Sequence, residues 1–175
     1  GCGASALHPE PLLARIDEVR RPGAIVSTNT SGLPIGGIAE GASDDLQAHF
    51  LGTHFFNPPR YMKLVEVVPG KRTHDDVVTL MRRFLAHRLG KGVALCKDTP
   101  NFIGNRYGAI AGAQVLAFAL EHGYTVEEVD AITGPLLGRP KTATFRLLDL
   151  VGIDVWVYVN ENLHGLIPHD EARDI

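Results

Sequence analysis

Two short apolar runs in the first half of the chain each carry one ionisable side chain. Residues 50–56 read Phe-Leu-Gly-Thr-His-Phe-Phe and contain His54, while residues 64–68 read Leu-Val-Glu-Val-Val and contain Glu66. Their length and their β-branched and aromatic residues predict strands. Because residues two apart in a strand share a face, Glu66 is expected to point into apolar surroundings. A buried carboxylate needs a partner, and the imidazole of His54 is the natural candidate.

The first part of the chain alternates predicted helices and strands. Pro11 is expected to open a helix with Leu12, Leu13, Ile16 and Val19 on one face, and Pro22-Gly23 to end it. A strand over residues 24–28 would deliver Asn29, Thr30 and Ser31 to its carboxyl end, where open α/β sheets place ligands. Further predicted elements are a short helix from about Pro34, the two strands bearing His54 and Glu66, a helix over residues 74–89 closed by Gly90, and a strand over residues 93–96.

After Asp98 the pattern becomes helical. Thr99 and Pro100 predict the start of a helix that runs to about His122. Within it, Gly104, Gly108 and Gly112 recur every four residues, which favours close approach of another helix over a simple weakening of this one. Thr125 to Glu128 predict a capping box, and two more helices are expected over residues 144–151 and 153–163. The chain therefore divides into an α/β part, residues 1–98, and an all-helical part, residues 99–175.

Composition limits the classes of partner. The 175 residues are 45% hydrophobic and 21% charged, which is typical of a globular chain with a real core. A net charge of −3 argues against nucleic acid and against a polybasic membrane contact. The apolar stretch 107–120 is shorter than the roughly 20 residues that a bilayer demands. Cys2 and Cys96 form no CxxC pattern, which favours a reducing, cytoplasmic compartment, and His49 and His54 lack partners at metal-ligand spacing.

Three groups of residues are those of a known family. His54-Phe-Phe-Asn-Pro58, then Leu64-Val-Glu-Val67, then Lys97-Asp-Thr-Pro-Asn-Phe-Ile-Gly-Asn-Arg106 occur in this order in the 3-hydroxyacyl-CoA dehydrogenases of fatty acid β-oxidation, which the chain closely resembles. The resemblance implies part of a Rossmann-like NAD-binding domain over residues 1–98. It also implies a helical domain similar to the C-terminal domain of 6-phosphogluconate dehydrogenase over residues 99–175. NAD would be the cofactor, an acyl-CoA thioester the substrate, and a homo-oligomer would form through the helical domain.

The resemblance also implies roles for individual residues. His54 would be the general base, since histidine is the side chain that ordinarily titrates near neutral pH. Glu66 would fix its tautomer and stabilise the imidazolium, as in other histidine–acid pairs. Ser31 and Asn105 would each donate a hydrogen bond to the reacting oxygen of the substrate. Ser31 would also lie beside the cofactor, and Asn57 would contact its nicotinamide end.

The start of the chain departs from the family pattern. Residues 1–6 fit G-x-G-x-x-A, but no strand precedes them, and Pro9 and Pro11 would break the helix that such a loop must open. We therefore expect a fragment without the pyrophosphate-binding loop. A family acid and lysine before the first helix, and a lysine after the last one, likewise have no counterpart here. A sheet without its first strands would expose an edge, so a stable monomer is not expected.

Two other functions stay open on sequence grounds. The chain could be a non-catalytic binding or dimerisation module, which NAD binding would discriminate. It could also be a serine hydrolase built on Ser31, His54 and Glu66, although Asn-Thr-Ser-Gly is not the Gly-x-Ser-x-Gly elbow of such enzymes. The sequence decides neither acyl chain length nor NAD against NADP. For contacts to the CoA phosphates it offers Arg60, Lys63 and Arg106 as candidates, against the simpler reading that they are surface charges.

Overall fold

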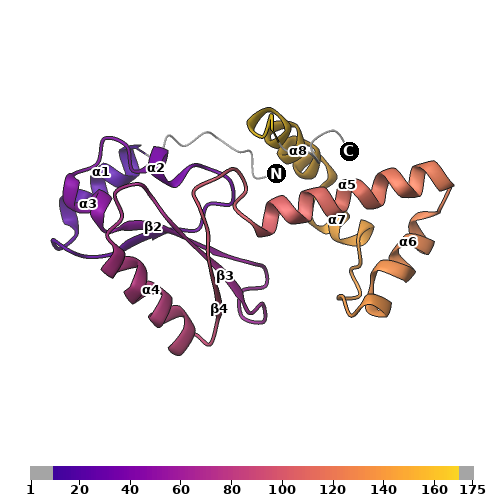
Figure 1. The fold of residues 1–175 in the computed structure, drawn as a ribbon, viewed down its shortest axis with the longest axis horizontal. Helices are drawn as coiled ribbons and strands as arrows, with labels where there is room; N and C mark the ends of the chain where they lie inside the picture. Colours follow the sequence, from indigo (N-terminus) through magenta and orange to yellow (C-terminus); the bar gives the residue numbers. More distant parts are fainter. Residues whose placement is uncertain (1–9, 170–175) are drawn as a thin grey trace. The chain divides into compact units, whose positions relative to one another are not determined.

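The computed structural model describes residues 10–169, and the glycine-containing segment at residues 1–6 lies outside this range. The chain divides into two compact units, Gly1–Ile103 and Gly104–Ile175. Unit 1 is α/β and unit 2 is helical, so the predicted order of the two fold classes is confirmed (Figure 1). The two units are described separately below.

Unit 1 is built on a four-stranded sheet in the order β1-β2-β3-β4. The strands are β1 (Val26–Thr28), β2 (Phe50–Phe55), β3 (Leu64–Pro69) and β4 (Gly92–Leu95). The pairs β1–β2 and β3–β4 are parallel, whereas β2 and β3 are antiparallel. The antiparallel register sets His54 directly opposite Glu66, and this cross-strand pairing positions the site.

Helices cover both faces of this sheet, and the strand residues alternate between them (Figure 1). One face holds Phe50 and Val68 against α1 (Glu10–Val19), α2 (Ile35–Ile38) and α3 (Asp44–Ala48). The other holds Leu51 and Val67 against α4 (Asp75–His87). This period of two follows from the pleat of the strand. Because His54 and Glu66 have the parity of Phe50 and Val68, they lie on the face that α1, α2 and α3 cover.

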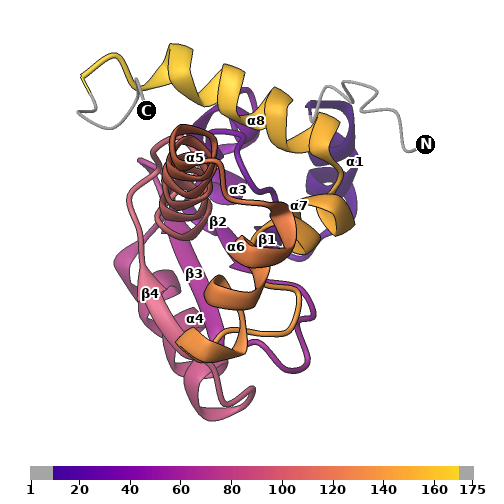
Figure 2. The ribbon, with the colours of Figure 1, turned by 90° about the vertical axis from the view of Figure 1, so that its right-hand side faces the viewer.

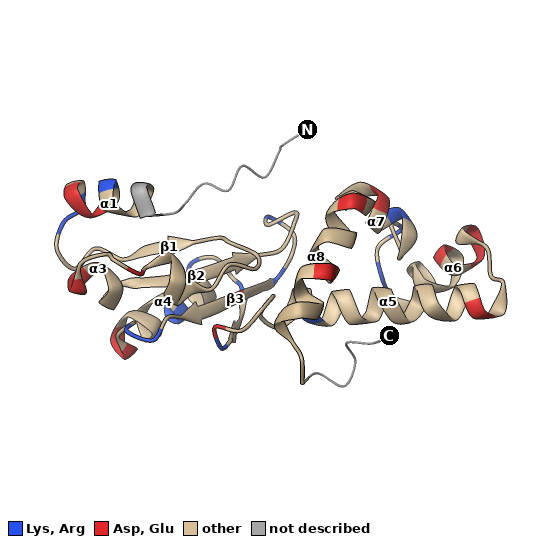
Figure 3. Cartoon of the chain, turned by 90° about the horizontal axis from the view of Figure 1, so that it is seen from above, with Lys and Arg blue, Asp and Glu red and all other residues tan. Residues whose placement is uncertain are grey.

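Glu66 differs from the other residues of the four described strands in carrying a carboxylate. Figure 3 shows the Lys, Arg, Asp and Glu residues of unit 1 mainly on helices and loops. Of the four strands in the described sheet, only β3 contains such a residue, and that residue is Glu66. A sheet buried on both faces accommodates a charge only where partners compensate it, so the surroundings of Glu66 carry information about function.

Most helices of unit 1 begin and end near their predicted positions, with two differences. Leu12 and Val19 of α1 are 62% and 82% exposed, so only part of the expected apolar face is buried, mainly at Leu13. The five-residue helix α3 was not predicted from the sequence. Its signal is Ser43, whose side chain accepts a hydrogen bond from the Leu46 N–H and caps the helix.

The helix predicted to begin at Pro100 begins instead at Gly104, as α5 (Gly104–His122). Asn101 and Phe102 have positive φ values of 57° and 51°, which no right-handed helix contains. The Phe102 side chain is 3% exposed and belongs to the core beneath α1 and α2. Burial of this ring therefore overrides the capping signal of Thr99 and Pro100, and the segment from 97 to 103 stays irregular.

Unit 2 contains α5, α6 (Val126–Thr133), α7 (Phe145–Val151) and α8 (Ile153–Leu166), with a short 3₁₀ helix at Pro135–Leu137. The capping box at Thr125 and Glu128 is present as predicted. Figure 2 shows α8 lying across α5. At their contact the Trp156 indole is 3.5 Å from the position a Gly112 Cβ would take, as close packing at the glycine series predicts. At Gly108 the same position is open, so the prediction fails there.

Candidate active site

His54 and Glu66 form a buried pair at the centre of the candidate site. The His54 Nδ1 and Glu66 Oε2 atoms are 2.6 Å apart, and the two side chains are 4% and 1% exposed. An ionised carboxylate can only accept hydrogen bonds, so Nδ1 carries the proton and donates it to Oε2. The remaining ring nitrogen, Nε2, is then the one with a free lone pair in the neutral imidazole. The pair has the geometry of a histidine base oriented by an acid.

Aromatic rings restrict the orientation of the His54 imidazole. The Phe56 ring lies 4.6 Å and the Phe102 ring 5.7 Å from it, measured between ring centroids, and both are tilted against it. Phe56 follows β2 directly, whereas Phe102 comes from the irregular segment that precedes α5. The packing of Phe102 thus explains why this segment departs from a helix beside the site.

The second carboxylate oxygen of Glu66, Oε1, has hydrogen-bond donors of its own. Oε1 accepts the Ile103 N–H at 3.0 Å and lies 3.6 Å from the Sγ atom of Cys96. Burial, together with the adjacent Glu66 carboxylate, raises the pKa of the Cys96 thiol to about 11. The thiol therefore keeps its proton at neutral pH and is a donor. The sequence reasoning found Glu66 but neither of these donors, because one is a backbone group and the other is remote in sequence.

The carboxyl end of β1 carries the other polar residues that the sequence singled out. Asn29 accepts the Phe55 N–H through its side-chain oxygen at 2.9 Å, so it ties the end of β1 to the end of β2. Ser31 lies two residues further on, in an exposed bend before α2. This hydrogen bond holds the bend near the strand that bears His54, at the sheet edge where open α/β sheets place ligands.

Asp98 fixes the next part of the same edge. Its two carboxylate oxygens accept the N–H groups of Ile35 at 2.8 Å and Gly36 at 2.9 Å, the first two residues of α2. This satisfies donors that the start of a helix leaves unpaired. Nothing in the sequence signalled this role, because the two N–H groups lie 63 and 62 positions away from Asp98 and a capping signal is read only beside its own helix.

Asn57 is exposed in the loop between β2 and β3. The Nζ atom of Lys91 donates to the Pro59 and Met62 carbonyl oxygens and so anchors this loop to the start of β4. Asn105 is the second residue of α5, as predicted, and is half-buried. Asn57 therefore belongs to unit 1, and Asn105 belongs to unit 2.

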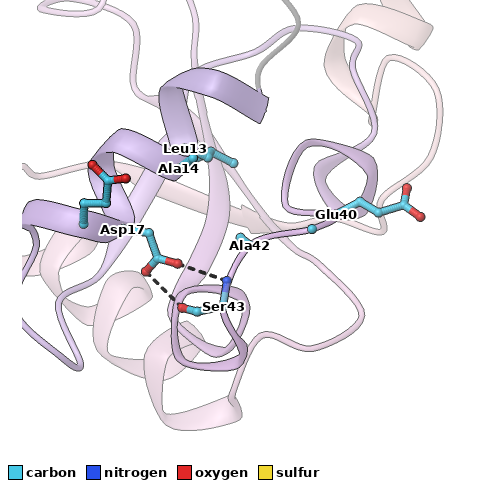
Figure 4. A pocket seen from close by; sticks show the side chains of 8 residues that line it. Leu13, Ala14, Asp17, Glu40, Ala42 and Ser43 are labelled. Atoms are coloured by element: carbon cyan, nitrogen blue, oxygen red, sulfur yellow. Dashed lines mark hydrogen bonds between the residues drawn. The ribbon is translucent and has the colours of Figure 1, made fainter.

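A separate hollow in unit 1 has a different lining. It measures about 900 Å³ and lies between α1 and the loop before α3 (Figure 4). Asp17, Glu18 and Glu40 line it, and the Asp17 carboxylate accepts hydrogen bonds from the Ser43 backbone N–H and hydroxyl. Arg20 pairs with Asp17 at 2.9 Å, but Glu18 and Glu40 repel the phosphates of a dinucleotide or of coenzyme A. This hollow is therefore a poor site for such ligands.

The described residues show neither a metal centre nor a membrane span. Within residues 10–169, no group of three or more His, Cys, Asp and Glu side chains is arranged to hold a metal ion. Over the same range, none of the helices combines the length and the hydropathy needed to cross a bilayer.

Comparison with known proteins decides the family. Residues 10–99 match the profile "3-hydroxyacyl-CoA dehydrogenase, NAD binding domain", and residues 102–174 match "3-hydroxyacyl-CoA dehydrogenase, C-terminal domain". The chain belongs to the 3-hydroxyacyl-CoA dehydrogenase family. The resemblance stated from the motifs is thereby confirmed, and NAD is the cofactor that the matched domain binds in this family.

Two curated relatives in this family are probable 3-hydroxyacyl-CoA dehydrogenases. The Bacillus subtilis protein is 52% identical over 162 residues, which are 93% of this chain and 20% of the relative. The Deinococcus radiodurans protein is 42% identical over 160 residues, which are 91% of this chain and 46% of the relative. The chain thus spans less than half the length of either relative.

Two solved structures share the fold of this chain. Mycobacterium tuberculosis FadB2 superposes with a TM-score of 0.82 and 28% identity, over 96% of this chain and 57% of that protein. The Escherichia coli K12 3-hydroxybutyryl-CoA dehydrogenase gives a TM-score of 0.76 and 32% identity, over 93% of this chain and 34% of that protein. The prediction of an α/β sheet of Rossmann type followed by a helical domain is confirmed.

Proposed function

We propose that the chain carries the catalytic part of an NAD-dependent dehydrogenase that oxidises L-3-hydroxyacyl-CoA to 3-oxoacyl-CoA in fatty acid β-oxidation. The observation that carries this proposal is the buried His54–Glu66 pair, with its 2.6 Å contact on adjacent antiparallel strands. Family membership supports the reaction class, and the pair supplies the base that the reaction requires.

His54 takes the hydroxyl proton of the substrate in this proposal. Its Nδ1–H is held by Glu66, so Nε2 is the nitrogen that accepts the proton as the C3–O bond becomes a carbonyl. The resulting imidazolium is stabilised by the Glu66 carboxylate at 2.6 Å. In the reverse direction the same nitrogen returns the proton to the carbonyl oxygen. Glu66 is buried and acts through His54 rather than on the substrate.

Ser31 and Asn105 are proposed to bind the reacting oxygen. A hydroxyl and a side-chain amide can each donate one hydrogen bond, which orients the substrate and stabilises developing negative charge. Ser31 is exposed in the bend after β1, as this role requires. For Asn105 the proposal rests on its place in the family motif, at the second residue of α5.

The residues present fit the nicotinamide end of NAD. Ser31 and Asn57 are exposed polar side chains in the loops that follow β1 and β2, and Asn29 joins the ends of these two strands. Such groups can hydrogen-bond the carboxamide of a nicotinamide ring. When bound, NAD accepts the hydride that leaves C3. We propose Ser31 and Asn57 as the residues of this chain that contact it, within a cofactor-binding part that covers residues 1–98.

A second candidate function is a binding or dimerisation module, and the helical unit favours it. Tyr107, Leu120 and Leu136 are 75%, 75% and 76% exposed, and large apolar side chains left uncovered in this way are available to a partner surface. We propose that residues 99–175 form the substrate and homo-oligomer part, and that the protein works in the cytoplasm. As an alternative to the dehydrogenase, the module would be non-catalytic, so turnover by the purified chain discriminates the two.

The test is the loss of NADH absorbance when the purified chain is mixed with NADH and acetoacetyl-CoA. Turnover that disappears in His54→Gln and persists in His49→Gln would support the dehydrogenase, since His49 is a histidine of unit 1 outside the pair. No turnover at saturating NADH, in a chain shown to be folded, would refute catalysis by this chain and leave the binding module.

A further inference from the structure

The segment that follows β4 reaches Glu66 at two points. The Cys96 N–H donates to the Val67 carbonyl at 2.9 Å, which extends the β3–β4 ladder by one residue. Cys96 therefore has the parity of Ala94, the residue opposite Glu66, and its side chain lies on the same face of the sheet. Seven residues later the chain returns, and the Ile103 N–H donates to Oε1 of Glu66 at 3.0 Å.

We propose that Cys96 is a positioning residue for the dehydrogenase site, and that its thiol acts with the Ile103 N–H to hold the Glu66 carboxylate in the plane that serves His54. The rotation of a glutamate carboxylate about its last torsion is broad and weakly restrained by the side chain itself. Two donors on Oε1 remove this freedom, and the other oxygen then faces Nδ1 of His54.

The chemistry of a thiol suits this position. With its raised pKa the Cys96 thiol stays protonated, so it never places a second negative charge beside Glu66. It is a weak donor, so it withdraws little charge from the carboxylate and leaves Oε2 a strong acceptor. The alternative acceptor for the thiol, the Ala94 carbonyl, is neutral and more distant at 3.8 Å, against 3.6 Å for Oε1. The charged acceptor is therefore favoured.

A spectroscopic experiment tests the contact without any turnover. The chain has two cysteines, so a Cys2→Ser background leaves Cys96 as its single thiol. The infrared S–H stretching band is then recorded with Glu66 intact and in Glu66→Gln. We expect the band to move to higher frequency in Glu66→Gln, because a neutral amide oxygen accepts a weaker hydrogen bond. An unchanged band in a folded variant would overturn the proposal.

A kinetic experiment tests the consequence, which rests on the proposed dehydrogenase function. In the NADH and acetoacetyl-CoA assay, Cys96→Ala should lower kcat by roughly 3- to 10-fold and leave both KM values unchanged, because one weak hydrogen bond to a positioning group is lost. Cys96→Ser keeps a donor and should recover most of the loss. Val77→Ala is the control, since it opens a cavity on the α4 face of the sheet.

The outcomes separate the two proposals. If the unsubstituted chain has no activity, the dehydrogenase proposal fails, while the S–H band still decides whether Cys96 holds Glu66. If the chain is active and Cys96→Ala keeps full kcat, or if Val77→Ala loses as much kcat as Cys96→Ala, the positioning role is wrong. A loss in Cys96→Ala that Cys96→Ser restores supports it.

Discussion

Replacement of Glu66 by glutamine should disable His54 by reversing its tautomer. The side-chain amide has the shape of the carboxylate but one acceptor oxygen and one NH₂ group. The Ile103 N–H can face only the oxygen, because two donors would otherwise meet at 3.0 Å. The NH₂ group then faces Nδ1 of His54 at the position where Oε2 now lies. Nδ1 becomes an acceptor, the proton moves to Nε2, and Nε2 can no longer take a proton from the substrate.

The magnitude follows from the burial and charge of the pair. A hydrogen bond to a charged group contributes about 1.5–3 kcal/mol, which corresponds to about 10- to 150-fold in rate. Loss of the correct tautomer adds to this, so we expect kcat to fall by at least ~100-fold. Glu66 is 1% exposed and, in the proposed mechanism, acts only through His54, so the KM values should change little.

Two measurements check the Glu66 prediction. Steady-state rates with NADH and acetoacetyl-CoA give kcat and KM, and the ¹⁵N shifts of the His54 ring report its tautomer even in an inactive chain. Glu66→Asp is the matched control, because it keeps a carboxylate and should retain the Nδ1–H form. The reasoning is refuted if folded Glu66→Gln keeps kcat within about threefold of the unsubstituted chain. It is also refuted if Nδ1 remains protonated.

Three further predictions concern packing, pH and thiol reactivity. Gly52→Ala should lower the free energy of unfolding by about 1–3 kcal/mol in urea titrations, because its Cβ would lie 2.8 Å from a buried side-chain carbon, whereas Gly108→Ala, with open space around it, should raise stability by about 0.5–1 kcal/mol. Equal effects of the two substitutions would contradict this. The hydrogen bond from Ser43 lowers the pKa of Asp17, so Asp17 stabilises the fold above its unfolded pKa and loses this contribution as pH falls through the folded value. The Tm difference between the unsubstituted chain and Asp17→Asn should therefore shrink below roughly pH 4, and a constant difference would argue against it. In a Cys2→Ser background, Cys96 should resist iodoacetamide at pH 8 until urea unfolds the chain, because its thiol is 4% exposed and has a pKa of about 11; rapid labelling of the folded chain, followed by mass spectrometry, would show otherwise.

Local patterns predicted the elements whose stability is itself local. The capping box at Thr125 and Glu128 needs only residues three apart, and it forms as predicted. The strands that bear His54 and Glu66 follow from their β-branched and aromatic residues, and their pairing was predicted from the cost of burying a carboxylate. The start of α5 was predicted wrongly, because the sequence pattern at Thr99 and Pro100 does not contain the burial of Phe102.

The sequence by itself determined the family motifs, the order of the α/β and helical parts, and the pairing of His54 with Glu66. These depend on residue types and on a period of two or 3.6 along the chain. Only the tertiary structure decided what holds Glu66: the Cys96 thiol, 30 positions away, and the Ile103 N–H, 37 positions away. Neither contact produces a periodic pattern in the sequence, because each forms where the chain folds back across the sheet. A buried carboxylate requires hydrogen-bond donors, and the tertiary fold determines which donors lie beside it.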